Sequence, residues 1–179
     1  MSTMHAVDEA IELTTKEFTS APEGWLLNGN QKKAELARIV ELYFTNFNLA
    51  HGKMDAQVEE VTVGTVLASM IDLTIRDYVM GLINSDNYDE MISACDYLMS
   101  QAPSQRYANA PATIAACVAY EKGDTTLAYD YLNHAEEEYP LANLIRRVVA
   151  AKWTPSAFSA MRYELHPKVT ASLFEGDKQ

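Results

Sequence analysis

The chain has 179 residues, of which 48% are hydrophobic and 22% charged, a balance typical of a folded domain with a substantial core and not of a disordered chain. Its seven glycines and six prolines fall mostly between periodic segments, which favours helices joined by short loops and disfavours an all-β fold. A formal net charge of -11 gives no general attraction to nucleic-acid phosphates, so a nucleic-acid partner is not expected and a basic protein is the electrostatically easier one.

The sequence predicts a cytoplasmic protein without a membrane segment. Its first residues lack the basic end and apolar run of a signal peptide, and no later window approaches the roughly 18 apolar residues of a membrane span. Cys95 and Cys117 lie in separate amphipathic segments without ligand spacing, so we expect two buried, reduced thiols. No cofactor is predicted.

The first helix is expected over residues 3–18, with Val7, Ile11, Thr14 and Phe18 on its packing face. Glycine, proline and asparagine then mark a break over residues 20–30. Three large apolar residues lie inside that break, namely Trp25, Leu26 and Leu27. Such residues either fold back onto the core or remain available to a partner, which makes this segment an interface candidate.

A second helix is predicted over residues 31–50. Its packing stripe has helical spacing and comprises Leu36, Ile39, Val40, Tyr43, Phe47 and Ala50. Leu42, Phe44 and Leu49 lie outside this stripe, so the apolar arc is wider than one packing face requires. The helix is therefore either central in the fold or part of a dimer surface, and Phe44 joins the interaction candidates.

The segment from 53 to 63 is predicted to be irregular with one short helix, although its valines suit a strand equally well. Thr62 is the expected N-cap of a third helix that ends near residue 83 and bends at Thr74 and Ile75. A fourth helix is expected over residues 87–101, where Pro103 stops it.

Residues 111–140 read as one tetratricopeptide-like helical hairpin. Pro111 suits the first turn of a helix that ends near residue 121, Gly123 breaks it, and Asp124 caps the next helix. In that helix Ala128, Leu132 and Ala135 alternate small and bulky side chains in the register of such a repeat, and Pro140 follows.

Beyond the hairpin we expect a helix over residues 141–152 and a short one opened by Thr154 and Pro155 that ends near residue 163. Residues 167–179 are expected to be a loose tail. The sequence thus predicts a single all-α domain over residues 1–179, a compact array of roughly eight helices.

The segment from about 62 to 155 resembles the helical C-terminal part of the actinobacterial domain of unknown function (DUF) 4192 family, also found in phages of those bacteria. Three patterns carry the likeness: Asp72-x3-Arg76-Asp77; Ala110-Pro111 with Ala115-Ala116; and Gly123-Asp124 followed by Ala128, Ala135, Pro140 and Leu141-Ala142. Residues 1–60 have no counterpart. The resemblance implies a helical fold and an actinobacterial or phage origin, and it transfers no catalytic residue.

Asp72, Arg76 and Asp77 form the most notable polar cluster. Asp72 and Arg76 are spaced i, i+4 and can meet on one helical face, while Asp77 can reach a neighbouring helix. We interpret the cluster as an ion pair that fixes helix register, with a functional site as the alternative. His134 and Glu138 could supply two metal ligands, but no third is nearby, so no metal site is predicted.

Arg146, Arg147 and Lys152, with Arg162 not far beyond, form the one local concentration of basic residues. Cations near the end of a helix complement its dipole, which accounts for part of the cluster. The rest could contact an acidic protein or a nucleic-acid phosphate.

The chain lacks a nucleophile elbow, a local cysteine and histidine signature and a phosphate-binding glycine loop, so we predict that it is not an enzyme. The leading hypothesis is a phage-encoded interaction module that binds a host protein or a second copy of itself as a homodimer. One alternative is an enzyme or small-ligand binder with a site around Asp72, Arg76 and Asp77. The other is a nucleic-acid regulator, which needs a continuous basic stripe from Arg146 to Arg162.

Overall fold

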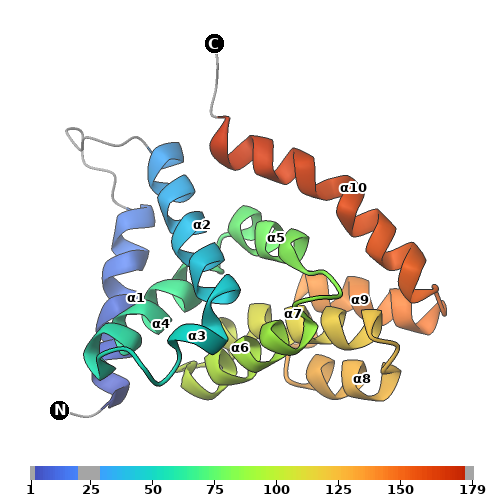
Figure 1. Ribbon diagram of the computed structural model, residues 1–179, viewed down its shortest axis with the longest axis horizontal. Helices are drawn as coiled ribbons and strands as arrows, with labels where there is room; N and C mark the ends of the chain where they lie inside the picture. The colour runs from blue at the N-terminus through green and yellow to red at the C-terminus, as the bar shows by residue number, and fades with distance from the viewer. Residues whose placement is uncertain (1–2, 20–28, 176–179) are drawn as a thin grey trace.

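The computed structural model describes residues 3–19 and 29–175, and within them all regular secondary structure is helical (Figure 1). The ten helices of this part are α1 (Thr3–Thr19), α2 (Gly29–Thr45), α3 (Phe47–Ala50), α4 (Ala56–Ser69), α5 (Leu73–Leu82), α6 (Tyr88–Gln101), α7 (Gln105–Glu121), α8 (Thr125–Asn133), α9 (Pro140–Ala150) and α10 (Pro155–Phe174). The predicted all-α class and compact helical array are confirmed. None of these helices is long and apolar enough to span a membrane.

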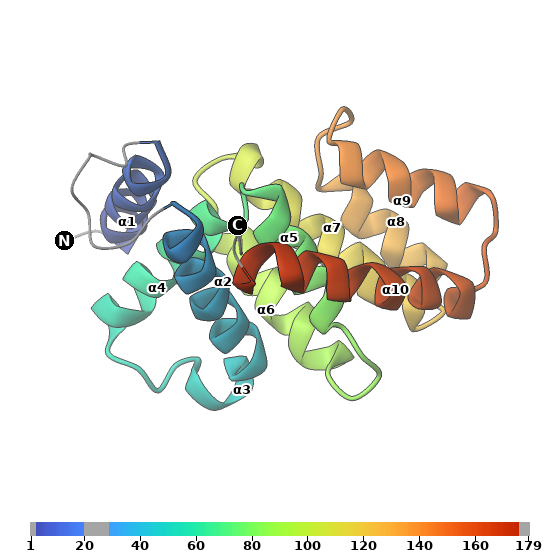
Figure 2. The same cartoon turned by 90° about the horizontal axis from the view of Figure 1, so that it is seen from above.

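Helix α7 lies at the centre of the fold, packed between α6 and α8 and also against α9 and α10 (Figure 2). Every residue from 109 to 120 is buried, and the many alanines among them allow neighbouring helices to approach closely. The helix begins at Gln105, so Pro111 lies inside it and not at its first turn as predicted. Burial on all sides stabilises this helix despite the proline, because tertiary packing outweighs the lost hydrogen bond.

The first helix packs on α4, and its predicted face is confirmed for Val7, Ile11 and Thr14, which are all buried. Gly64 of α4 makes this approach possible, because a Cβ at this position would lie 2.6 Å from the Cβ of Ala10 on α1. The side chain of Phe18 and the whole Trp25-Leu26-Leu27 segment lie outside the described residues.

Three predictions between residues 53 and 83 need correction. The segment from 53 to 63 is irregular only over residues 53–55, because the long helix α4 begins at Ala56, where the Asp55 carboxylate accepts a 3.0 Å hydrogen bond from the Gln57 N–H. Thr62 is inside α4 and is not its cap. The expected bend at Thr74 is a break two residues earlier, where Asp72 caps α5 and accepts hydrogen bonds from Thr74 and Ile75.

The hairpin formed by α7 and α8 matches its prediction closely. Gly123 has φ +86°, a conformation that favours glycine, and the Asp124 carboxylate accepts a 2.9 Å hydrogen bond from the Leu127 N–H. Ala128 and Leu132 are buried in α8, and Ala135 is buried just beyond its end. The small and bulky positions therefore serve helix packing.

The C-terminal region is a long helix and not the short helix with a loose tail that the sequence predicts. Helix α10 continues through Pro167 to Phe174 and packs against α5 (Figure 1). Tyr78 of α5 stacks on His166 with ring centroids 5.5 Å apart, and it meets Phe174 edge-on at 5.3 Å. A Cβ on Gly81 would collide with the His166 ring, so the two helices touch through this glycine.

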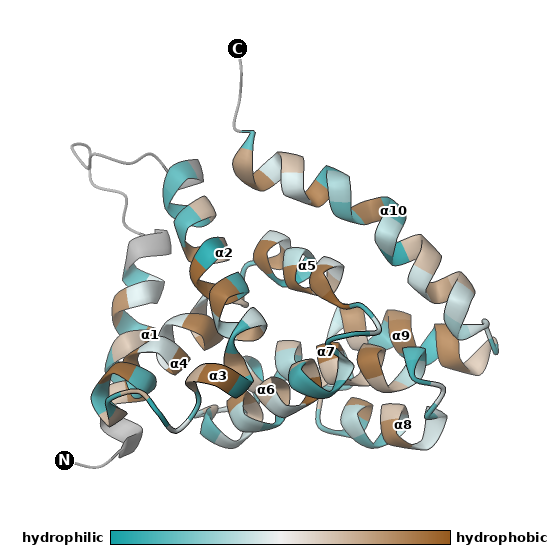
Figure 3. Ribbon diagram, in the orientation of Figure 1, coloured by the Kyte–Doolittle hydropathy of each residue, from teal (hydrophilic) through white to brown (hydrophobic). Residues whose placement is uncertain are grey.

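The distribution of hydropathy follows this packing. Figure 3 shows hydrophilic residues over the first turns of α2 and apolar residues over its later turns and over α5. The predicted second helix is broken at Asn46 into α2 and the single turn α3. That break, together with the return of α4, creates a pocket between these helices.

Candidate binding pockets

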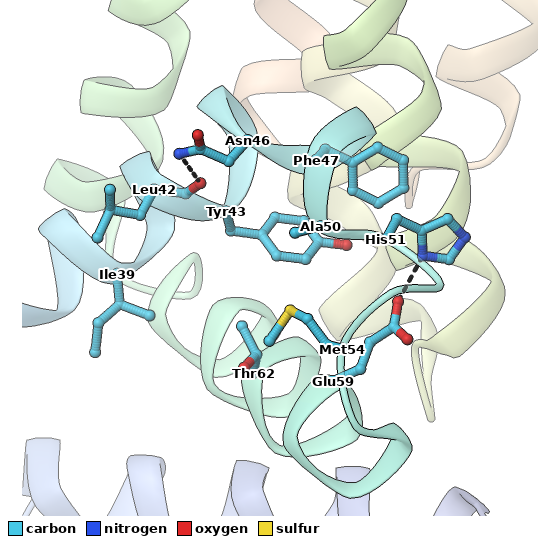
Figure 4. Close-up of a pocket in the computed structure, with 10 residues that line it drawn as sticks. All are labelled: Ile39, Leu42, Tyr43, Asn46, Phe47, Ala50, His51, Met54, Glu59 and Thr62. Atoms are coloured by element: carbon cyan, nitrogen blue, oxygen red, sulfur yellow. Dashed lines mark hydrogen bonds and ion pairs between the residues drawn. The ribbon is translucent and has the colours of Figure 1, made fainter.

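The first pocket, here called the α2–α4 groove, lies between α2, α3 and the first half of α4 and encloses about 320 Å³ (Figure 4). This volume is within the range of small-ligand sites, about 300–1,000 Å³. Its lining residues are Ile39, Leu42, Tyr43, Asn46, Phe47, Ala50, His51, Met54, Glu59 and Thr62. Most of the lining is apolar.

Local sequence explains why a groove forms between these helices. The Leu42 carbonyl at the end of α2 accepts two hydrogen bonds from Asn46, one of 3.1 Å from the backbone N–H and one of 3.0 Å from the side-chain amide. Gly52, with φ +71°, lets the chain reverse after α3, and Asp55 then starts α4. The three elements diverge from this turn and leave a groove between them.

Tyr43 and Phe47 meet edge-on inside the groove, with ring centroids 5.6 Å apart. The Tyr43 hydroxyl is fully buried and has no hydrogen-bond partner within the described part of the chain. Burial, followed by the nearby Cys95, raises the pKa of Tyr43 above its ordinary value, so the hydroxyl is neutral. The buried hydroxyl is therefore an unsatisfied polar group behind the wall of the groove.

His51 and Glu59 fix one end of the groove. The His51 Nδ1 lies 2.5 Å from the Glu59 Oε1, and the His51 ring stacks on Phe47 with centroids 4.8 Å apart. Figure 4 shows this pair beside Met54, at the end away from Ile39. The pair joins the turn after α3 to α4.

Exposed apolar side chains line part of the α2–α4 groove. Leu42 is 61% exposed, and Ile39 and Met54 are 39% and 37% exposed. Leu49 on α3 is also exposed, at 69%. The predicted wide apolar arc is thus present, but Phe44 is wrong as an interaction candidate, because it is 1% exposed and part of the core. Leu42 and Phe44 are two residues apart and so lie on nearly opposite sides of α2. The neighbouring helices decide which side is buried.

The second pocket, here called the α5–α10 pocket, lies between α5, α9 and α10 and encloses about 390 Å³. Its lining residues are Arg76, Asp77, Met80, Pro140, Leu141, Leu144, Ile145, Phe158, Met161, Arg162, Leu165, His166, Lys168 and Val169. The alternative hypothesis of a site around Arg76 therefore has a pocket to match, although the pocket is chiefly apolar.

The polar cluster is arranged differently from its prediction. Asp72 does not pair with Arg76, because it caps α5 and lies 2.7 Å from the Lys33 Nζ. Arg76 instead pairs with its neighbour Asp77, with 2.6 Å between Nη2 and Oδ1, and donates a 3.1 Å hydrogen bond to the Tyr139 hydroxyl. Of the three residues, only Arg76 and Asp77 line the α5–α10 pocket.

A buried ion pair beside this pocket was not visible from sequence. Arg162 is bound by Glu121 at two points, 2.7 Å from Nε to Oε1 and 2.8 Å from Nη2 to Oε2, and its Nη1 donates to the Met80 carbonyl at 2.8 Å. Burial disfavours the guanidinium charge, but the contacts with Glu121 outweigh it and raise the pKa of Arg162. The contacts join α10 to both α7 and α5.

The predicted basic cluster is not a continuous surface. Arg146 donates hydrogen bonds to carbonyls at the end of α8, including a 2.7 Å bond to Leu132, so it joins two helices. Arg147 and Lys152 are exposed. Arg162 is buried and ion-paired, so the stripe that a nucleic-acid regulator requires is interrupted.

Metal ligands do not gather in the described ranges, 3–19 and 29–175, where no group of three histidine, cysteine, aspartate or glutamate side chains could hold an ion. Cys95 and Cys117 are buried free thiols, as predicted. Burial is the main cause that raises the pKa of both thiols, which keeps them protonated and unreactive.

No protein-family model, curated protein or solved structure matches this chain. The resemblance of residues 62–155 to the DUF 4192 family therefore stays a prediction.

Proposed function

We propose that this protein is a non-enzymatic interaction module that binds another protein through the α2–α4 groove. The observation that carries the proposal is an apolar pocket whose lining includes the exposed side chains of Ile39, Leu42 and Met54. Contiguous apolar surface of this kind on a small domain usually meets a partner, because leaving it in water costs free energy.

The shape of the groove suits an amphipathic helix from the partner. A pocket of about 320 Å³ between helices can accept one or two large apolar side chains, and the exposed side chains of Ile39 and Leu42 can contact the next turns. Buried aromatic or leucine anchors of this type contribute most of the free energy in such complexes.

Charge favours a partner of different sequence. With a net charge of -11, two copies of this chain repel each other, whereas a helix with lysine or arginine beside its apolar face is attracted. The resemblance to an actinobacterial and phage family supports a phage origin and a host protein as the partner. Self-association is the competing version of the proposal.

Site-specific crosslinking tests this function. A photoreactive amino acid at Leu42 should crosslink the partner in actinobacterial lysate, and one at Leu73 should not, because Leu73 lies outside the groove with a similar exposure of 58%. Leu42→Glu should abolish capture of that same protein by the unlabelled chain, whereas the matched Leu73→Glu should preserve it.

Two results would refute the proposal. One is capture that is equally strong for Leu42→Glu and Leu73→Glu, which would place the contact elsewhere on the surface. The other is crosslinking from both positions to the same set of proteins, as expected of nonspecific apolar contact. Light scattering of the purified chain distinguishes a partner of different sequence from a second copy of this chain. A monomer is expected. A dimer that Leu42→Glu dissociates would assign the groove to self-association.

A further inference from the structure

The α5–α10 pocket shares apolar walls with the α2–α4 groove but differs from it in charge. Three cationic side chains, Arg76, Arg162 and Lys168, line it in a protein that is otherwise strongly acidic. Leu144 and Leu165 remain exposed where α9 and α10 face the pocket, while Phe158 and Ile145 are buried. An apolar ligand could therefore enter between α9 and α10 and bury its chain against these residues.

The two arginines in the pocket have unused donors. A guanidinium carries five N–H groups, and the contacts of Arg76 with Asp77 and Tyr139 use three of them. The contacts of Arg162 likewise use three. Both groups are held rigidly by these contacts, so their remaining N–H groups are preorganised for an acceptor.

The charged side chains at the pocket, counted with their ion-pair partners, carry one excess positive charge. Arg76 is balanced by Asp77, and Arg162 is balanced by Glu121. Lys168 lines the pocket, is exposed, and has no ion-pair partner among the residues that the structure describes. Burial, followed by the nearby Arg162, lowers the pKa of His166, so its ring is neutral at pH 7 and adds no charge.

From this geometry we propose that the α5–α10 pocket binds an apolar monocarboxylate of the fatty-acid type. The chain lies against Leu144, Phe158 and Leu165, and the carboxylate meets Lys168 and the free N–H groups of Arg76. One negative charge neutralises the excess, and the apolar chain fills a cavity of about 390 Å³. This ligand site is independent of the proposed protein contact at the α2–α4 groove.

Titration calorimetry with decanoate, decan-1-ol and decylamine tests the proposal, because the three probes share a chain and differ in charge. Decanoate should bind most tightly and decylamine most weakly. Octanoate, two methylenes shorter, should bind on the order of tenfold more weakly than decanoate, because each buried methylene contributes to affinity. Decylamine binding as tightly as decanoate would overturn the proposal, and so would an absence of decanoate binding.

Matched variants locate the site. Lys168→Gln should weaken decanoate binding by about three- to fivefold, as expected for an exposed charge pair, and leave decan-1-ol unchanged. Lys53 is exposed and lies outside both pockets, so Lys53→Gln should change the affinity for neither decanoate nor decan-1-ol. Equal decanoate affinity for Lys168→Gln and the wild type would exclude the proposed carboxylate position.

A second pair of variants separates the two pockets. Leu144→Glu should weaken decanoate binding more than tenfold, because it places a carboxylate at the pocket, and Leu42→Glu should have no effect. The reverse pattern would assign the ligand to the α2–α4 groove and refute this proposal. Thermal melts of both exposed-site variants should match the wild type, which excludes loss of fold as the cause.

Discussion

Replacing Arg162 with methionine should destabilise the fold strongly, because it leaves a buried carboxylate without its counter-ion. The side chains of Arg162 and Glu121 are 4% and 1% exposed, and two N–H groups bind the two carboxylate oxygens at 2.7 Å and 2.8 Å. After the substitution, the hydroxyl of Tyr88, 3.2 Å from Oε2, would be the remaining hydrogen-bond donor to Glu121 among the contacts that the structure describes.

Removing one partner of a buried pair typically costs about 3–5 kcal/mol. For a domain of this size that loss lowers the melting temperature by about 6–20 °C. Urea titration of Arg162→Met and Glu121→Leu should each show a loss of that order in the free energy of unfolding. The double variant should lose less than either single one, because two apolar side chains can pack where the ion pair was.

Arg147→Met is the matched control, since Arg147 is exposed near the end of α9, and it should change stability by at most about 1 kcal/mol. If the losses of the two single variants simply add in the double variant, the ion pair is not a coupled unit and the reasoning is wrong. A loss for Arg162→Met as small as that for Arg147→Met would also refute it.

Three further predictions follow from buried groups. Tyr43→Phe should leave stability unchanged or raise it by up to about 1 kcal/mol, because it removes a hydroxyl without a hydrogen-bond partner. Tyr131→Phe breaks a 2.9 Å hydrogen bond to a carboxylate and should lower stability by a similar amount. Thermal melts that rank the two variants the other way would contradict this. Gly64→Ala should cost about 1–3 kcal/mol by forcing α1 away, and limited proteolysis should then cut α1 first; unchanged melting and cleavage would count against it. Burial, followed by the hydrogen bond to Glu41, raises the pKa of Tyr78 to about 12 in the folded protein. As pH rises, the Tyr78 hydroxyl therefore ionises in the unfolded chain before it does so in the folded one, and the free energy of unfolding should fall between about pH 10 and pH 12. Tyr78→Phe should reduce that slope in urea titrations across the same pH range, and an unchanged slope would exclude Tyr78 as its source.

Local sequence was a good guide wherever a helix end depends on a neighbouring residue. Asp124 and Gly123 were assigned their cap and break from sequence, and both take those roles. Pro111 is predicted in the first turn of a helix and Pro167 at the start of a loose tail, and both lie inside helices. Packing decides these cases, because contacts with several neighbouring helices outweigh the hydrogen bond that a proline removes.

The candidate sites were less predictable than the helices. Sequence placed Arg76 and Asp77 correctly in one cluster but paired Arg76 with Asp72, because i, i+4 spacing shows which side chains can meet and not which ones do. The α2–α4 groove was missed, although Asn46 and Gly52 gave a local sign that the second helix ends early.

By itself the sequence determined that this protein is helical, acidic and built around small residues, since these properties follow from composition and from the spacing of neighbouring residues. Tertiary structure alone decided that Phe44 is buried beside an exposed Leu42, and that Arg162 reaches Glu121 across 41 residues of chain. The physical reason is that burial and ion pairing depend on which helices come together, and that arrangement minimises the free energy of the whole chain and not of any one segment.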